Sequence, residues 1–113
     1  MNAPARLVTD ENLEAALCWL RDHAVEIGKA KARAVKAEHM LKHIEALEFK
    51  ASIASSNDAK KADARVSARY LAAIIEDAEA AGEYERLKSL REAAAMRIEA
   101  WRTEAANFRA MRI

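Results

Sequence analysis

Two histidines and a cysteine are the side chains of this sequence whose types and spacing best suit chemistry. His39 and His43 are four residues apart, so both lie on one face of a helix, as a metal-binding pair requires. The zincin pattern also needs a glutamate directly after the first histidine, and Met40 stands there instead. Cys18 is the single cysteine, so it has no disulfide partner in the chain and is predicted as a small buried hydrophobe. We therefore expect no metal site and no cofactor.

The sequence shows no motif of an enzyme. It contains neither a glycine-rich phosphate loop nor a strand-turn-helix nucleophile elbow. Carboxylates gather between residues 76 and 85, but no histidine stands at the spacing that a bundle-core metal site would need. Long helices packed along their length rarely form a concave pocket. The prediction is a protein that is not an enzyme.

Charge is distributed unevenly, although the net formal charge is only +1. The run KAKARAVK at 29–36 has four positive charges and no negative one, and the stretch 76–85 has five carboxylates and no positive charge. A cationic groove on a helical hairpin would follow a nucleic-acid backbone without reading its sequence, whereas the alternative is a solvated helix surface. The acidic stretch is expected to contact the basic run of a neighbouring subunit. The candidate nucleic-acid-binding residues are Lys29, Lys31, Arg33, Lys36, Lys60, Lys61, Arg65 and Arg69.

Helices must position all of these side chains. The chain is rich in alanine and other helix formers and has only two glycines and one proline. Apolar residues recur at steps of three and four in the front and the back of the chain, and the polar stretch 55–58 between them favours a turn. The predicted fold class is all-α, a long antiparallel helical hairpin (a coiled coil), with a short third helix at 59–66 as an option. Ser67 is a candidate cap for the helix that follows.

The helix boundaries are predicted from local signals. Thr9 is an N-cap, with Val8 and Leu13 as a hydrophobic staple, so the first helix should run from residue 10 to about 54. Residues 1–8 are predicted as a disordered lead and residues 9–113 as one helical hairpin domain. Gly82 is expected to be carried through the last helix, and Gly28 marks a slip in the repeat that overwinds the supercoil.

The repeat also predicts the core. The core and oligomer contacts are Leu13, Leu17, Leu20, Ile27, Leu41, Ile44, Leu87, Ile98, Trp101 and Phe108, and the apolar positions of 67–81 include Tyr70, Leu71, Ile74 and Ala78. Because so much of this core is alanine, it is thin, and a homo-oligomer would cover the remaining apolar surface. No apolar run approaches the length of a membrane span and no signal peptide is evident, so we expect a cytoplasmic protein without membrane contact.

The segment 98–109, IEAWRTEAANFR, resembles a recurring ending of small, helical, uncharacterised phage proteins, I-E-x-W-R-[ST]-x-x-A-N-x-R. The segment 13–20, LEAALCWL, is similar to their opening, LEEAL-x-x-L, and the region 68–70 matches more loosely. The likeness spans most of the chain. Gly82 departs from it, and a continuous last helix depends on that residue being tolerated.

This resemblance implies a place among phage early proteins that handle DNA replication and recombination. The implied role is a non-enzymatic accessory protein in the bacterial host cell, which contacts single-stranded DNA or a recombination or annealing protein. The basic surface would neutralise phosphates. The alternative is a protein–protein interaction module, such as an inhibitor of a host defence enzyme or an assembly adaptor, which needs only the helical surface and its charge asymmetry.

Overall fold

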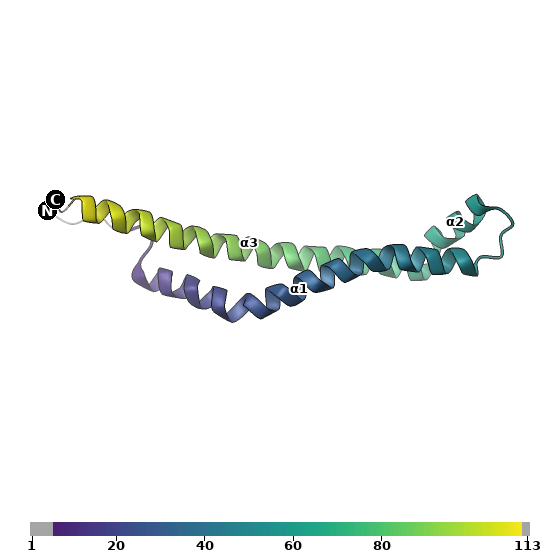
Figure 1. Cartoon of the computed structure of the whole chain (residues 1–113), viewed down its shortest axis with the longest axis horizontal. Coiled ribbons are helices and arrows are strands. Elements are labelled where there is room, and N and C mark those ends of the chain that lie inside the picture. Colours follow the sequence, from purple (N-terminus) through teal and green to yellow (C-terminus); the bar gives the residue numbers. More distant parts are fainter. Residues whose placement is uncertain (1–5, 112–113) are drawn as a thin grey trace. The chain divides into compact units, whose positions relative to one another are not determined.

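The structure, a computed structural model, describes residues 6–111 and forms three helices and no strand in that range. The helices are α1 (Asp10–Ala51), α2 (Asn57–Val66) and α3 (Ala68–Met111), shown in Figure 1. The predicted all-α helical hairpin is confirmed. The first helix ends slightly before the predicted residue 54, and Gly82 lies inside α3 as expected.

The start of α1 is capped by the residue that the sequence predicts. The amide of Asn12 donates to the Thr9 hydroxyl oxygen at 3.1 Å, which satisfies one of the unpaired donors of the first turn. Just before it, Val8 is buried, and the amide of Leu7 donates to Glu104 Oε1 of α3 at 2.9 Å. The last residues of the predicted lead therefore contact α3 through this hydrogen bond, and the disorder of the lead stays a prediction. Its first five residues lie outside the described range.

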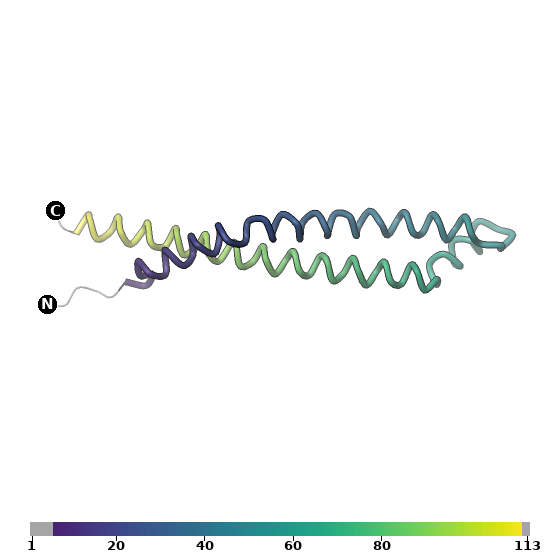
Figure 2. The backbone as a smooth tube through the Cα atoms, turned by 90° about the horizontal axis from the view of Figure 1, so that it is seen from below, coloured from purple at the N-terminus to yellow at the C-terminus, as the bar shows by residue number. Residues whose placement is uncertain are grey.

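The short helix α2 follows α1 in the teal part of the chain (Figure 2), and a serine stands at each of its ends. The Ser56 hydroxyl accepts from the amide of Ala59 at 3.1 Å and caps its start. At the end of α2, the amide of Ser67 donates to the Ala64 carbonyl. The Ser67 hydroxyl accepts from the amide of Tyr70 at 3.1 Å and so caps the first turn of α3. The short third helix and the Ser67 cap are both confirmed.

The chain divides into two units, each built from parts of α1 and α3. The first comprises residues up to 27 and from 87 onward, and the second comprises residues 28–86. In the first unit, the Trp101 indole donates to Asp10 Oδ1 at 3.0 Å, so Trp101 lies beside the first turn of α1. In the second unit, Arg33 pairs with Glu76 and Glu48 with Arg69, so positions that ascend along α1 meet positions that descend along α3, and the two helices run antiparallel there.

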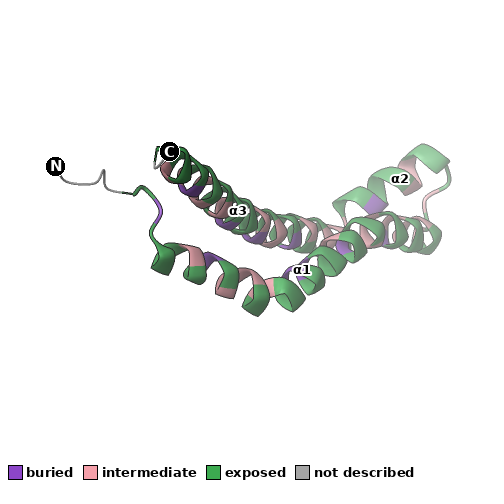
Figure 3. Ribbon diagram, turned by 60° about the vertical axis from the view of Figure 1, so that its left-hand side comes forward, coloured by how far each residue is buried: buried purple, intermediate pink, exposed green. Residues whose placement is uncertain are grey.

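The line of α1 residues that packs against α3, called the seam below, differs in its first part from the repeat predicted from the sequence. Figure 3 colours the buried positions of α1. Ala16 is 2% exposed and His23 is half-buried, whereas Leu17 is 50% exposed and Ala24 is also exposed. From Ala16 onward, steps of four and three alternate without interruption. The prediction that Leu17 belongs to the seam within the chain is wrong, and so is the predicted slip. The large side chain of Leu17 suggested a seam position, but an alanine lets the two helices approach more closely.

The same regular alternation runs along α3, again through small residues. Ala73 is half-buried and Ala80 is buried, whereas Leu71, Ile74 and Ala78 are exposed, so these three predicted apolar positions do not face α1. Of the ten predicted core residues, Ile27, Ile44 and Leu87 are buried, Leu17 is exposed, and Leu13, Leu20, Leu41, Ile98, Trp101 and Phe108 are half-buried.

Candidate functional site

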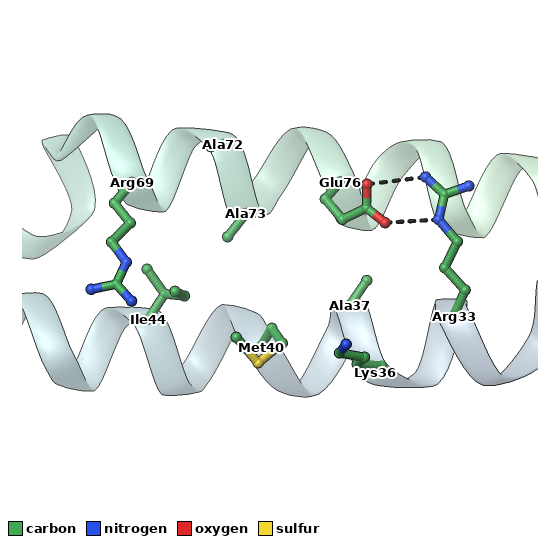
Figure 4. A pocket seen from close by; sticks show the side chains of 9 residues that line it. All are labelled: Arg33, Lys36, Ala37, Met40, Ile44, Arg69, Ala72, Ala73 and Glu76. Carbon is green, nitrogen blue, oxygen red and sulfur yellow. Dashed lines mark hydrogen bonds and ion pairs between the residues drawn. The ribbon is translucent and has the colours of Figure 1, made fainter.

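A groove with a volume of about 400 Å³ lies between α1 and α3 in the second unit (Figure 4). Its apolar lining comes from Ala37, Met40 and Ile44 of α1 and from Ala72 and Ala73 of α3. Alanines on both helices fill little of the space beside the seam, and this leaves a hollow that Met40 lines with a flexible, polarisable side chain. The groove is therefore a consequence of the small residues that bring the helices together.

Three cations surround this apolar lining. Arg33 and Lys36 stand one turn apart on α1, and Arg69 comes from α3. Arg33 and Arg69 extend from opposite helices and bound the groove at its two ends (Figure 4). All three side chains are exposed, so they are accessible to a ligand that enters from solvent.

Arg33 is held in place by Glu76, the one carboxylate that lines the groove. Its Nε donates to Glu76 Oε1 at 2.7 Å and its Nη2 to Oε2 at 3.0 Å, a bidentate pair. These hydrogen bonds lower the pKa of Glu76, and the charge of Lys36 adds a smaller effect in the same direction. The same pair raises the pKa of Arg33. Glu76 therefore remains ionised at neutral pH and offsets part of the positive charge of the groove.

The other two cations differ in how far they are neutralised. Arg69 Nη1 lies 3.9 Å from Glu48 Oε1, an ion pair without a hydrogen bond. Among residues 6–111, Lys36 forms no ion pair within 4.0 Å, so its charge is the one most available to an anionic ligand.

The structure brings together three of the eight predicted nucleic-acid-binding residues, namely those of this groove. Lys31 stands two residues before Arg33, and side chains two apart on a helix point to different sides. Lys29 is exposed but does not line the groove. Lys29, Arg33 and Lys36 recur at steps of four and three and share one side of α1, so within the basic run only Lys31 points elsewhere.

The three predicted residues of α2 lie at a separate place. Lys60 Nζ is 5.9 Å from the centre of the Phe49 ring, and Arg65 Nε pairs with Glu45 Oε1 at 3.4 Å. Lys61 lines a second hollow of about 440 Å³, beside Lys42. These contacts hold α2 against the end of α1, so much of this positive charge serves the packing of α2.

The acidic stretch has a partner that differs from the predicted one, and the histidines do not form a metal site in the described residues. Glu76 and Glu79 approach Arg33 of the same chain, at 2.7 and 4.0 Å, where we expected a neighbouring subunit. His23 stacks on Trp19 with ring centres 4.3 Å apart. His39 and His43 are exposed, and the part of the chain that the structure describes holds no group of three metal-ligating side chains.

The sequence reasoning missed the apolar half of the groove and its carboxylate. Met40, Ala72 and Ala73 were not recognised as lining residues, and neither was Glu76. A helical projection drawn around the observed seam would have found them, because it places Arg33, Met40 and Glu76 beside the seam and Lys31 across it. Such a projection can be drawn only once it is known which residues of α1 and α3 form the seam.

Comparisons with protein-family models, with curated proteins and with solved structures give no match. No helix in the described range is long and apolar enough to cross a membrane. The function must therefore be argued from the groove and from the surfaces around it.

Proposed function

We propose that this chain is a non-enzymatic protein–protein interaction module whose groove binds an acidic amphipathic helix of a partner protein. The observation that carries the proposal is the combination of an apolar lining with cations from both α1 and α3. A helix that docks in a groove places apolar side chains at steps of three and four into the floor. Carboxylates beside those side chains would then meet Lys36, Arg33 and Arg69, which fixes the orientation of the docked helix.

Single-stranded DNA contact is the second candidate, favoured by the convergence of the three cations. The groove suits this ligand less well. Single-strand binding usually combines a basic track with aromatic side chains on which bases stack, and none of the lining residues is aromatic. Glu76 would repel the carboxylates of a docked helix as well as phosphates, so the lack of an aromatic side chain in the lining is what separates the two candidates.

The natural partner follows from the resemblance to phage early proteins. On that basis it is a recombination or annealing protein in the cytoplasm of the bacterial host. An inhibitor of a host defence enzyme or an assembly adaptor would use the same groove. All of these roles need an exposed helical surface and no catalytic group.

Fluorescence anisotropy with two labelled probes tests the proposal. One probe is a synthetic helix with leucines on one face and flanking glutamates, and the other is a single-stranded oligonucleotide, both at about 50 mM salt. We expect the peptide to bind and Lys36→Glu to weaken it about tenfold, because the substitution places a carboxylate where the peptide carries its own. The matched control is Lys31→Glu, the same charge change on the same helix but outside the groove, and it should leave the affinity unchanged.

Three results would contradict the proposal: no peptide binding, an equal loss in both variants, or equal binding of a peptide with lysines in place of its glutamates. Oligonucleotide binding that weakens steeply with salt, and that both lysine variants reduce, would instead support the second candidate.

A further inference from the structure

The hollow beside α2, with a volume of about 440 Å³, lies where this helix packs against the end of α1. Three of its lining residues, Lys42, Ala46 and Phe49, recur along α1 at steps of four and three and therefore share one face of that helix. Lys61 lines the hollow from α2. Lys42, Ala46 and Lys61 are exposed, so the hollow opens to solvent. It shares no lining residue with the groove between α1 and α3 and is therefore a separate site.

Phe49 gives this hollow the aromatic side chain that the groove lacks. The residue is half-buried, and Lys60 Nζ lies over its ring, 5.9 Å from the ring centre. That distance is close to the outer limit of about 6 Å for a cation–π contact, so Lys60 covers the ring only loosely. The ring can therefore stack with a planar group that enters the hollow from solvent.

The attachment of α2 does not by itself account for an aromatic side chain at position 49. Ala64, which is 0% exposed, is the residue that α2 buries. Next to it, the hydroxyl of Ser52 donates to Asp63 Oδ2 at 2.6 Å and ties the segment after α1 to α2. Phe49 is only half-buried and lines an open hollow, whereas a side chain that served packing alone would be enclosed between the helices.

The positive charge around the ring is largely unneutralised within the chain. Among residues 6–111, Lys42 and Lys61 form no ion pair within 4.0 Å. The one carboxylate of the lining belongs to Glu45, and its Oε1 accepts from Arg65 Nε at 3.4 Å. Because Arg65 offsets the charge of Glu45, the two lysines leave the hollow with a net positive charge beside an aromatic ring.

We propose that this hollow binds a single-stranded nucleic acid, with one base stacked on Phe49 and the adjoining phosphates on Lys42 and Lys61. Single-strand binding combines these two elements, because aromatic rings stack on bases of any sequence and cations follow the backbone. The ammonium group of lysine is a compact charge that suits phosphate. An acidic peptide would satisfy the lysines but leave the ring without a planar partner. This contact does not rest on the helix-binding function proposed for the groove.

Fluorescence anisotropy with a labelled oligothymidylate of about 12 nucleotides, at about 50 mM salt, tests the stacking contact. Phe49→Leu retains an apolar side chain beside α2 but removes the ring, and we expect it to weaken binding about tenfold. Phe49→Tyr retains the ring and should retain the affinity. The matched control is Phe108→Leu, because Phe108 is also half-buried and has Arg6 over its ring at 5.0 Å, but lies in the other unit. It should bind as the unmodified chain does.

A salt titration tests the phosphate contacts. Lys42→Gln should lower the slope of log affinity against log salt by about 0.7, the value for one phosphate contact on a single strand. Lys42 forms no ion pair within residues 6–111, so helicity measured by circular dichroism should not change. Lys31→Gln, the same change on α1 outside both sites, should leave the slope unchanged.

Four results would overturn the inference: no oligonucleotide binding, an equal loss in Phe49→Leu and Phe108→Leu, a Phe49→Tyr variant as weak as Phe49→Leu, or equally tight binding of a duplex of the same length. A polyglutamate peptide that competes as well as the oligonucleotide would also overturn it, because charge alone would then explain the binding.

Two cross-measurements separate this inference from the function proposed for the groove. The Phe49→Leu variant should still bind the acidic helical peptide, and the Lys36→Glu variant should still bind the oligonucleotide. Failure of the hollow to bind the oligonucleotide leaves peptide binding intact, and failure of the groove to bind the peptide leaves oligonucleotide binding intact.

Discussion

Truncation of Leu87 is the sharpest test of where the seam lies. Leu87 is 1% exposed and is the largest side chain that the described residues bury fully. Leucine-to-alanine changes at buried sites cost about 2–5 kcal/mol, and a seam between only two helices can partly close around the cavity. We therefore expect the free energy of unfolding to fall by about 2–3 kcal/mol, which is a large part of the stability of a small domain.

The matched control is Leu17→Ala, the same change at the position that the sequence pattern favoured. Half of this side chain is already in water, so its loss should cost at most about 1 kcal/mol, and the higher helix propensity of alanine offsets part of that. Urea denaturation followed by circular dichroism, at one fixed protein concentration, measures both variants. If Leu17→Ala costs as much as Leu87→Ala, the seam through Ala16 is wrong.

Two further predictions concern Gly28 and Glu76. Gly28→Ala should raise the free energy of unfolding by roughly 0.5–1 kcal/mol, measurable as a higher Tm, because a Cβ there meets no atom within 4 Å; a lower Tm would mean that a partner approaches this position. The Glu76→Gln variant should be less stable than the unmodified chain at about pH 7, because Arg33 lowers the pKa of Glu76 in the folded state. That stabilisation is present above the ordinary pKa of 4.5 and is lost as the pH falls through the lower folded pKa, so the Tm difference should shrink as the pH is lowered below 4.5; a constant difference would exclude the charge as its cause.

The local features of the fold could be predicted from the sequence because single residues encode them. Thr9 and Ser67 cap helices through their own hydroxyl groups. Of the polar stretch 55–58, Ser55 and Ser56 lie in the break between α1 and α2, whereas Asn57 and Asp58 already form the first turn of α2. Gly82 is tolerated inside α3, as expected from the absence of other turn residues beside it. These signals act within one helical turn, so the chain order alone contains them.

The register of the seam could not be predicted in the same way. In an alanine-rich helix, apolar residues at steps of three and four allow more than one seam, and Leu17 and Ala16 compete for the same position. The seam residues on α3 decide between them, and that information is distant in sequence. Because the prediction took Leu17, the larger residue, in place of Ala16, it placed the first part of the seam one position too late in the chain. It then had to include a slip in the repeat near Gly28, whereas the buried residues follow an unbroken repeat.

The candidate site inherits this difficulty. Lys31 and Arg33 are equivalent in a count of charges, and only their places relative to the seam separate a groove residue from one that lies elsewhere. The pairing of Arg33 with Glu76 also joins residues that are 43 apart in sequence. The positive charge could therefore be predicted, but not its division between a groove, the α2 surface and ion pairs.

Methyl NMR of methionine tests the central claim, that the groove binds an acidic amphipathic helix. Met40 is the methionine in the groove lining, whereas Met96 and Met111 are exposed in the first unit. With ¹³C-methyl-labelled methionine, titration of the acidic peptide should shift the Met40 signal in a saturable way, leave the Met96 and Met111 signals in place, and lose its effect in the Lys36→Glu variant. An unmoved Met40 signal at saturating peptide, or equal shifts at Met40 and Met96, would contradict the account.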